Sequence, residues 1–447
     1  MKISNPLRRG LCLLALAGCS HALQADPLAP ENFTARFQST YNWQTHSAYA
    51  AAYSGPNSVY ANREKMYTFS ATAHFGIRLG AGTELYFNPE ISQGVPFSNN
   101  LVGLGGFTNG EITRAAGANP TPYRQRLFVR QVWNGEGEQT AVAEGFNQLA
   151  GMQSTERVVL TAGNFSILDV FDGNAYAKDP RSQFMNWGGW TYAAYDYAAD
   201  ARGFGWGATL EWYRKDWVWR IGRMTGPQTP NALPLDFALA QHYGDQVEVE
   251  HAHQLGELPG KVRVMAWRNR AQLASFNDAL TWLKANPGNY TGPDALVAVR
   301  SSNKIKYGLG VNVEQALNDH AGAFLRAMQT DGRTETLAFT EVDASLATGL
   351  HVHGNRWGRP DDHAGLALMR NYLSPERRRF LAAGGISYFI GDGALHYAPE
   401  TIIEGYYNLS LPHHTNLSLD YQRIQNPAYN AARGPLHVFA VRAHVEF

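Results

Sequence analysis

The sequence predicts an all-β protein: a transmembrane antiparallel barrel of the outer-membrane kind, with about sixteen strands and short helices in its loops. Three observations predict this class. Polar and apolar residues alternate with a period of two in many segments of the chain. No segment after residue 25 reaches the roughly 18 consecutive apolar residues that a membrane-spanning helix requires. Aromatic residues make up 12% of the chain, which suits strands and the interfacial girdles of such a barrel.

The first 25 residues are expected to form a signal peptide that is removed on export, so that 26–447 forms one barrel domain. This leader has a basic start, an apolar middle and small residues at its end. Cleavage after Ala22 or Ala25 fits that pattern, and lipidation at Cys19 is the alternative, because the residues before it resemble a lipoprotein cleavage box. Both cysteines lie in the leader, so disulfides and thiolate chemistry are excluded from the mature protein.

Alternation defines the expected strands along the chain. In 67–79, every position on one face is apolar, whereas the other face carries threonine, serine, histidine and arginine. The clearest alternating segments, in chain order, are 33–44, 67–79, 84–91, 204–212, 307–314, 403–411, 417–422 and 436–447. About seventeen candidate strands can be counted, and single-chain bacterial barrels have even numbers, so sixteen are expected, with the assignment open in 319–353.

The last expected strand, 436–447, ends the chain on Phe447. One of its faces is apolar near the end, whereas the other carries Arg442, His444 and Glu446. So many strands leave a lumen too wide for side chains to fill, so the polar face is expected inside and wet. The apolar face is expected to meet lipid and to provide the signal that the barrel assembly machinery reads.

Two segments have the pattern of short helices. Residues 275–285 begin with Ser275 and Asp278 in capping-box spacing and stop before a proline and a glycine. Residues 374–385 begin with serine, proline and glutamate and end at two glycines. Both helices are expected in loops or in a plug.

Composition and motifs exclude several other classes. Without the leader, acidic residues slightly outnumber basic ones, which gives no support for nucleic acid as a partner. No catalytic serine elbow, phosphate-binding glycine loop or His-Glu-x-x-His motif is present. The pair His351 and His353 is expected on one face of a strand end, and His413 and His414 in a solvated turn, rather than in metal sites. The sequence therefore predicts neither an enzyme nor a protein with a metal or other cofactor.

Two strand segments, 84–90 and 124–130, are expected to place charges on the wall of the lumen. The charged residues that alternation turns inward are Glu84 and Glu90 in the first segment, and Arg124, Arg126 and Arg130 in the second. Acidic and basic groups across a narrow lumen can filter ions and can hydrogen-bond hydroxyl groups. The alternative is that these charges only keep a wet wall hydrated.

The long loop 166–202 is the third candidate segment, because it mixes planar polar groups with aromatic rings. Sugars need both, since vicinal hydroxyls take bidentate hydrogen bonds and the C–H face packs on a flat apolar surface. We expect a constriction loop folded into the mouth of the barrel, rather than an outer loop that packs on itself. Its candidate pore-lining residues are Asp172, Asn174, Arg181 and Trp187.

At these segments the sequence resembles the carbohydrate-selective (OprB-type) porins. The matching stretches are 84–94, 106–111, 126–131, 171–187, 339–343, 356–361 and 419–447, which together span almost the whole mature chain. The resemblance implies a sixteen-stranded outer-membrane barrel for passive, substrate-selective diffusion of sugars without a cofactor. The lumen-facing residues carried over from it are Glu90, Arg126, Arg130, Asp172, Asn174 and Arg181.

The expected protein is thus a sugar porin in the bacterial outer membrane. Its expected partners are a mono- or oligosaccharide, membrane lipid and the assembly machinery, and the oligomeric state, monomer or homotrimer, stays open. The rival hypothesis is a general or anion-selective diffusion pore without a sugar site. A barrel hydrolase would need a serine–histidine pair near a carboxylate, and no motif provides one.

Overall fold

The barrel wall accounts for most of the chain. The computed structural model describes residues 30–112, 117–339 and 341–447, and the predicted leader with its cleavage site lies outside them. Within these ranges, sixteen strands form one closed antiparallel sheet, and two further strands form a separate hairpin. The predicted fold class and strand number are therefore confirmed.

The elements follow in chain order. The barrel strands are β1 (Phe33–His46), β2 (Glu64–Gly80), β3 (Thr83–Val95), β4 (Gly117–Asn134), β7 (Arg157–Phe165), β8 (Gly205–Arg214), β9 (Trp217–Met224), β10 (Tyr243–Leu255), β11 (Leu258–Leu273), β12 (Ser301–Asn318), β13 (Ala321–Thr330), β14 (Ala344–Gly354), β15 (Arg359–Tyr372), β16 (Glu400–Leu411), β17 (Thr415–Gln425) and β18 (Leu436–Glu446). The other elements are the hairpin strands β5 (Gln139–Val142) and β6 (Gly151–Ser154), and the helices α1 (Trp187–Trp190), α2 (Phe276–Ala285), α3 (Asp294–Val299) and α4 (Pro375–Ala382).

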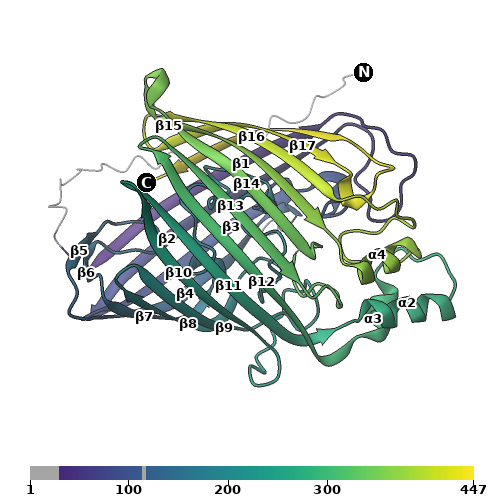
Figure 1. Ribbon diagram of the computed structural model, residues 1–447, viewed down its shortest axis with the longest axis horizontal. Coiled ribbons are helices and arrows are strands. Elements are labelled where there is room, and N and C mark those ends of the chain that lie inside the picture. Colours follow the sequence, from purple (N-terminus) through teal and green to yellow (C-terminus); the bar gives the residue numbers. More distant parts are fainter. Residues whose placement is uncertain (1–29, 113–116, 340) are drawn as a thin grey trace, which may run out of the picture.

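Strand pairing follows the chain around the barrel (Figure 1). Successive barrel strands pair with one another, β4 pairs with β7, and β18 closes onto β1. In the closing register, Thr40 lies opposite His444 and Tyr41 opposite Ala443. Closure leaves no unpaired sheet edge, which a membrane wall requires because lipid cannot hydrogen-bond to the backbone.

The two ends of the barrel differ in the length of their connections. At one end, the turn end, two residues join β2 to β3, β8 to β9, and β10 to β11. At the other, the loop end, the connections are long and carry α2, α3 and α4, on the right of Figure 1. The turn end has one long connection, 135–156, which carries the β5–β6 hairpin.

The alternation predicted from the sequence is the one that the wall adopts. On β18, Phe439 is 50% exposed on the outer face, whereas Arg442 is fully buried on the inner face. On β1, Phe33 is exposed and its neighbour Thr34 is buried. The region 319–353, where the sequence did not decide the strand assignment, contains β13 and β14 with a loop between them.

The two predicted helices are present as α2 and α4. Ser275 and Ser374 are their N-caps, and each side chain accepts a hydrogen bond from a backbone amide of the first turn. In the described part of the chain, no helix has the length and apolar character needed to cross a membrane.

The interior differs from the expected wet lumen in one respect. Buried aromatic and aliphatic side chains form a large cluster inside the barrel, contributed by the wall and by the loop 166–204 together. Phe171 and Tyr192 of this loop are fully buried there, and Met265 of β11 belongs to the same cluster. The lumen is therefore partly filled by a hydrophobic core, because a folded-in loop supplies the volume that wall side chains cannot reach.

Candidate functional site: a constriction inside the barrel

The connection between β7 and β8, residues 166–204, folds into the barrel. Its Asp172 is fully buried. The carboxylate accepts hydrogen bonds from Thr191 Oγ1 at 2.9 Å and from the Tyr192 backbone amide at 3.1 Å. The same carboxylate pairs with Arg326 Nε of β13 at 2.8 Å and accepts from Asn312 Nδ2 of β12 at 2.6 Å. Asp172 therefore fastens the loop to the β12–β13 wall.

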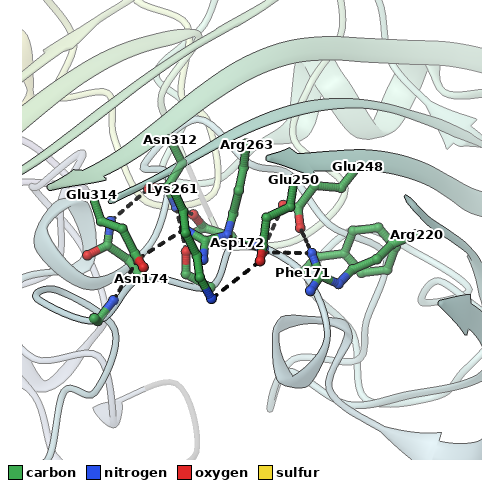
Figure 2. A network of polar contacts seen from close by, with 12 residues as sticks. Phe171, Asp172, Asn174, Arg220, Glu248, Glu250, Lys261, Arg263, Asn312 and Glu314 are labelled. Carbon is green, nitrogen blue, oxygen red and sulfur yellow. Dashed lines mark hydrogen bonds and ion pairs between the residues drawn. The ribbon is translucent and has the colours of Figure 1, made fainter. Parts of the chain in front are cut away.

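A ladder of alternating charges lies on the wall beside this anchor (Figure 2). Arg220 of β9 pairs with Glu248 and Glu250 of β10 at 2.9 and 3.0 Å. Arg263 of β11 pairs with Glu250 at 2.7 Å and with Glu314 of β12 at 3.0 Å. Glu248 and Glu314 each accept a further hydrogen bond from a backbone amide of the loop, at 3.0 and 2.8 Å. The ladder thus pairs each of its two arginines with two of its three glutamates and holds the loop at the same time.

The loop is fastened to the rest of the wall as well. Glu404 of β16 accepts hydrogen bonds from two successive loop amides at 2.5 and 3.1 Å. Arg442 of β18 donates to the carbonyls of Pro180 and Gln183 at 2.7 and 2.9 Å. Arg442 was expected on the wet inner face, and the structure places it there as an anchor of the loop. The loop therefore bridges the lumen between the β12–β13 and β16–β18 walls.

A second connection, between β3 and β4, also folds inward and joins the first. Glu400 of β16 accepts hydrogen bonds from the amides of Gly105 and Gly106 at 2.9 and 2.8 Å. Between the two loops, the Trp187 amide donates to the Phe107 carbonyl at 2.8 Å, and the Gly110 amide donates to a loop carbonyl at 2.9 Å. The two loops form one unit inside the barrel.

Where the two loops meet, they enclose a cavity of about 120 Å³, which we call the constriction cavity. Its lining comes from loop residues: Gly110, Ser166, Leu168, Asp169, Lys178, Pro180, Arg181, Trp187, Trp190, Tyr197, Arg202 and Gly203. Wider cavities lie elsewhere. One of about 590 Å³ is lined largely by loop-end residues such as Asn100 and Pro293, and one of about 660 Å³ by turn-end residues such as Asp216 and Gln254.

Two indole rings line the constriction cavity with unused donors. Trp187 and Trp190 meet edge to face with their ring centres 5.1 Å apart, and Phe107 and Tyr197 pack around Trp187. Among the described residues, neither indole N–H has a hydrogen-bond acceptor, although both nitrogens are buried. Buried donors are nearly always paired, so two unpaired indole donors on residues that line one cavity distinguish this place from an ordinary packed interior.

Charged groups surround the same cavity. Arg126 of β4 makes two hydrogen bonds of 2.7 Å to the Asp169 carboxylate, which holds that lining residue in place. Arg181 lies 2.7 Å from Glu111 and 3.7 Å from Glu90, and its side chain keeps 14% of its exposure. The arginines are thus fixed by carboxylates with part of Arg181 still facing open space.

Six of the seven candidate residues from the sequence fall into two groups. Arg181 and Trp187 line the constriction cavity, and Arg126 and Glu90 contact lining residues from behind. Asp172 and Asn174 belong to the anchor, where Asn174 Nδ2 donates to Asn312 Oδ1 at 2.7 Å. The structure does not bring Arg130 to this place. It lies four residues from Arg126 along β4, about 13 Å nearer the turn end, and donates to the Asn147 carbonyl at 2.8 Å.

Arg124 was predicted to face the lumen, and that prediction is wrong. The pairing of β3 with β4 shifts by one residue between Asn88 and Pro89, which leaves Gln125 as an extra residue in β4. Such a β-bulge reverses the alternation beyond it. Gln125 therefore points inward, whereas the Arg124 guanidinium lies outside, 5.1 Å from the centre of the Trp206 ring.

Three functional residues were not predicted. Lys178 and Arg202 line the constriction cavity, and Arg326 holds the loop anchor. Lys178 and Arg202 lie in a loop, where no sequence periodicity predicts the direction in which a side chain points. Arg326 offered a signal, because it is the one charged residue in the apolar segment 321–330, and a charge there is costly on a lipid-facing side.

Lys178 should give the constriction a pH dependence. Burial lowers the pKa of its ammonium group to about 8, although Asp172 nearby opposes the shift. The group is charged below this pKa and neutral above it, so the constriction loses one positive charge as pH rises through about 8. We expect the anion-to-cation permeability ratio in planar bilayers to fall between about pH 7 and pH 9.

The matched variant is Lys178→Met, which removes the titrating group and keeps most of the side-chain volume. Its permeability ratio should be low and flat across the same pH range. A fall of the same size and midpoint in Lys178→Met would assign the titration to another group.

The closed sixteen-stranded wall, the apolar outer face and the inward-folded loops define the class of protein: a diffusion channel of the outer-membrane porin kind. The chain belongs to the carbohydrate-selective porin, OprB family, which matches residues 44–447. It is accordingly a porin for the selective passage of sugars, and its family and fold are those of channels and not of enzymes.

Comparison with solved structures gives the same fold. Pseudomonas putida OprB at high pH matches with a TM-score of 0.65 at 13% identity, covering 93% of this chain and 94% of that chain. The DcaP channel of Acinetobacter baumannii matches with a TM-score of 0.50 at 8% identity, covering 93% and 98%. Pseudomonas aeruginosa OccK2 covers 92% and 97% with a TM-score of 0.44 at 10% identity. Comparison with curated protein sequences gives no match.

Proposed function

We propose that sugars cross the outer membrane of a bacterium by passing through the constriction cavity, from the loop end to the turn end. Short turns face the periplasm and long loops face the outside in bacterial barrels, which supports this direction. A sugar then meets the wide cavity near Pro293, the constriction, and the wide cavity near Asp216 in turn. Passage is passive diffusion, which the porin family and the porin fold support.

The observation that carries the proposal is the pair of unused indole donors beside Arg181. A hydroxyl can accept from Trp187 or Trp190 and from the guanidinium, while the indole rings offer apolar surface to the C–H face of the ring. Each contact is weak alone, so a sugar can bind and leave quickly, which conduction requires. We propose Glu90, Arg126 and Asp169 as the groups that keep these donors in position.

The two ends of the chain are proposed to direct export and assembly of the barrel. Residues 1–25 are proposed as the removed leader, and 26–447 as one barrel domain in contact with outer-membrane lipid. The strand ending at Phe447 is proposed as the contact for the barrel assembly machinery. Its exposed apolar face supports this, since Phe447 is 62% exposed and stacks on Phe37 at the turn end.

The test is the ion current through single channels in a planar bilayer. Glucose or maltose should reduce the current in a saturable manner, because a bound sugar displaces ions from the constriction. Trp190→Phe replaces the indole by a smaller aromatic ring and removes one donor, so it should weaken sugar block by about 0.5–1.5 kcal/mol, or about two- to tenfold.

The matched control is Trp212→Phe, which changes a tryptophan that is 46% exposed on the outer wall. Its block should equal that of the unmodified protein. No block by any mono- or oligosaccharide, together with strong anion preference, would instead assign the protein to general anion diffusion.

A further inference from the structure

A groove lies on the outer surface of the barrel wall, away from the lumen. It has a volume of about 820 Å³ and runs over β10, β11, β12 and the end of β13. Most of its lining side chains point outward: Asp245, Val247, Ala266, Arg268, Tyr307, Leu309, Gln329 and Asp331. These four strands are neighbours in the wall and are labelled in Figure 1. The sugar path does not use this groove.

The groove arises from one small side chain in a row of large ones. Val247, Ala266 and Leu309 lie side by side on adjacent strands. Val247 is 48% exposed and Leu309 is 58% exposed, so both project from the wall while the methyl group of Ala266 does not. This leaves a short apolar channel over Ala266, which ends at the exposed Val264 further along β11, with a width of about two strand spacings, or roughly 10 Å.

The loop-end mouth of the groove is polar and carries positive charge. Arg223 and Arg268 share one carboxylate, that of Asp245, at 2.7 and 3.0 Å, which leaves this group with an excess positive charge. Both guanidinium groups lie near the ring of Tyr243, at 3.9 and 5.5 Å. Arg270 stands one step further along the same face of β11, opposite Tyr243.

The opposite edge of the mouth carries the carboxylate of Asp331. Its backbone amide bonds to the carbonyl of Tyr307, which places the Tyr307 side chain between Asp331 and Arg268. Two strand spacings, or about 10 Å, therefore separate this carboxylate from the arginine pair. The positive charge is concentrated on the β9–β11 side of the mouth.

We propose that the groove is a binding site for one phosphate-bearing membrane lipid. Its acyl chain lies in the channel over Ala266, and its phosphate receives hydrogen bonds from Arg268 and Arg223. Both halves are needed: buried methylenes give affinity in proportion to their number, and arginines match phosphate geometry. The site lies at the membrane rim, where Tyr307 is 53% exposed in the manner of an interfacial aromatic residue. A lipid supplied by the surrounding leaflet fits these charges better than a second barrel, which would have to present a matching anion.

The experiment is native mass spectrometry of the full barrel in mixed micelles that contain phosphatidylglycerol and diacylglycerol with identical acyl chains. The unmodified protein should retain one phosphatidylglycerol in preference to diacylglycerol. Ala266→Leu fills the channel and should lower retention of both lipids about tenfold. Arg268→Gln should remove the preference for phosphatidylglycerol and leave diacylglycerol retention unchanged.

Two control variants change matched residues elsewhere on the outer wall. Ala73→Leu enlarges an outward alanine of β2, and Arg370→Gln neutralises an exposed arginine near the loop end of β15. Both should retain lipid as the unmodified protein does. Equal retention in Ala266→Leu would overturn the proposal. So would a dimer that Ala266→Leu separates, because the groove would then belong to a second copy of this chain.

Discussion

Replacement of Arg326 by methionine should raise the single-channel conductance severalfold and abolish sugar block. Arg326 and Asp172 are both fully buried, and their contact holds the constriction loop to the wall. Removal of one partner of a buried pair costs about 3–5 kcal/mol, because the remaining charge has no compensation. The loop segment that contains Asp172 should therefore leave the wall and widen the lumen. Single-channel recording measures the conductance, the current noise from loop motion and the sugar block together.

The charge-free double variant Asp172→Asn with Arg326→Met separates loop release from loss of the arginine itself. It removes both charges of the Asp172–Arg326 pair, so neither is left unpaired and conductance should return towards the original value. Asn312 and Thr191 remain as side-chain partners of residue 172 among the described residues. Arg370→Met, on the outer wall, is the matched arginine control and should leave conductance unchanged. Original conductance and block in Arg326→Met would show that the other anchors hold the loop without Asp172.

Those other anchors explain why the loop stays inside a lumen that it must bridge. Glu404 and Arg442 hold it on one wall, and Asp196 pairs with Lys306 at 2.9 Å on the other. Each contact joins a loop group to a strand residue far away in sequence. Burial of a charge inside the barrel costs much less free energy when the charge has a partner. Every charged anchor on the wall therefore needs a matching group on the loop. The anchors therefore act as a set, and the sugar path depends on residues that never touch sugar.

The wall was predictable because a strand reports its two faces in its sequence. Phe439 and Arg442 are exposed and buried as alternation requires, and a two-residue period carries that information without any knowledge of partners. The strand number followed from counting with the even-number rule. The same argument failed at Arg124, because one extra residue at Gln125 reverses the faces. The sequence feature that marks this bulge, Pro89, lies on the partner strand β3, so alternation along β4 alone could not show it.

The constriction was predictable only in part. Its loop was found from length and composition, and Arg181 and Trp187 were among its candidates. Lys178 and Arg202 were missed, because a loop has no period that tells which side chains meet at a cavity. Arg126 and Arg130 share a face of one strand, so alternation could not separate them. Arg126 and Arg130 contact different residues because they lie at different positions along the barrel axis. That position depends on strand tilt and register across the whole barrel.

Arg181→Gln should produce the second large effect, a loss of sugar affinity by about 10- to 100-fold, with a lower anion preference. Hydrogen bonds to charged groups contribute about 1.5–3 kcal/mol, and Arg181 has a partly exposed guanidinium that lines the constriction cavity. The expected loss applies to saturable sugar block, measured as the concentration that halves the ion current. Conductance should change little, because Arg181 does not take part in the Asp172 anchor.

Arg181→Lys distinguishes recognition from charge, because it keeps the cation and removes the planar, bidentate donor. It should retain the anion preference of the unmodified channel and still lose most of the sugar affinity. Arg130→Gln is the control for arginine loss on the same side of the lumen, since Arg130 contacts Asn147 near the turn end, and its block should stay close to the original. Equal block in Arg181→Lys and the unmodified protein would mean that sugar senses only positive charge. Strong loss in Arg130→Gln would move the sugar site from the constriction cavity towards the turn end.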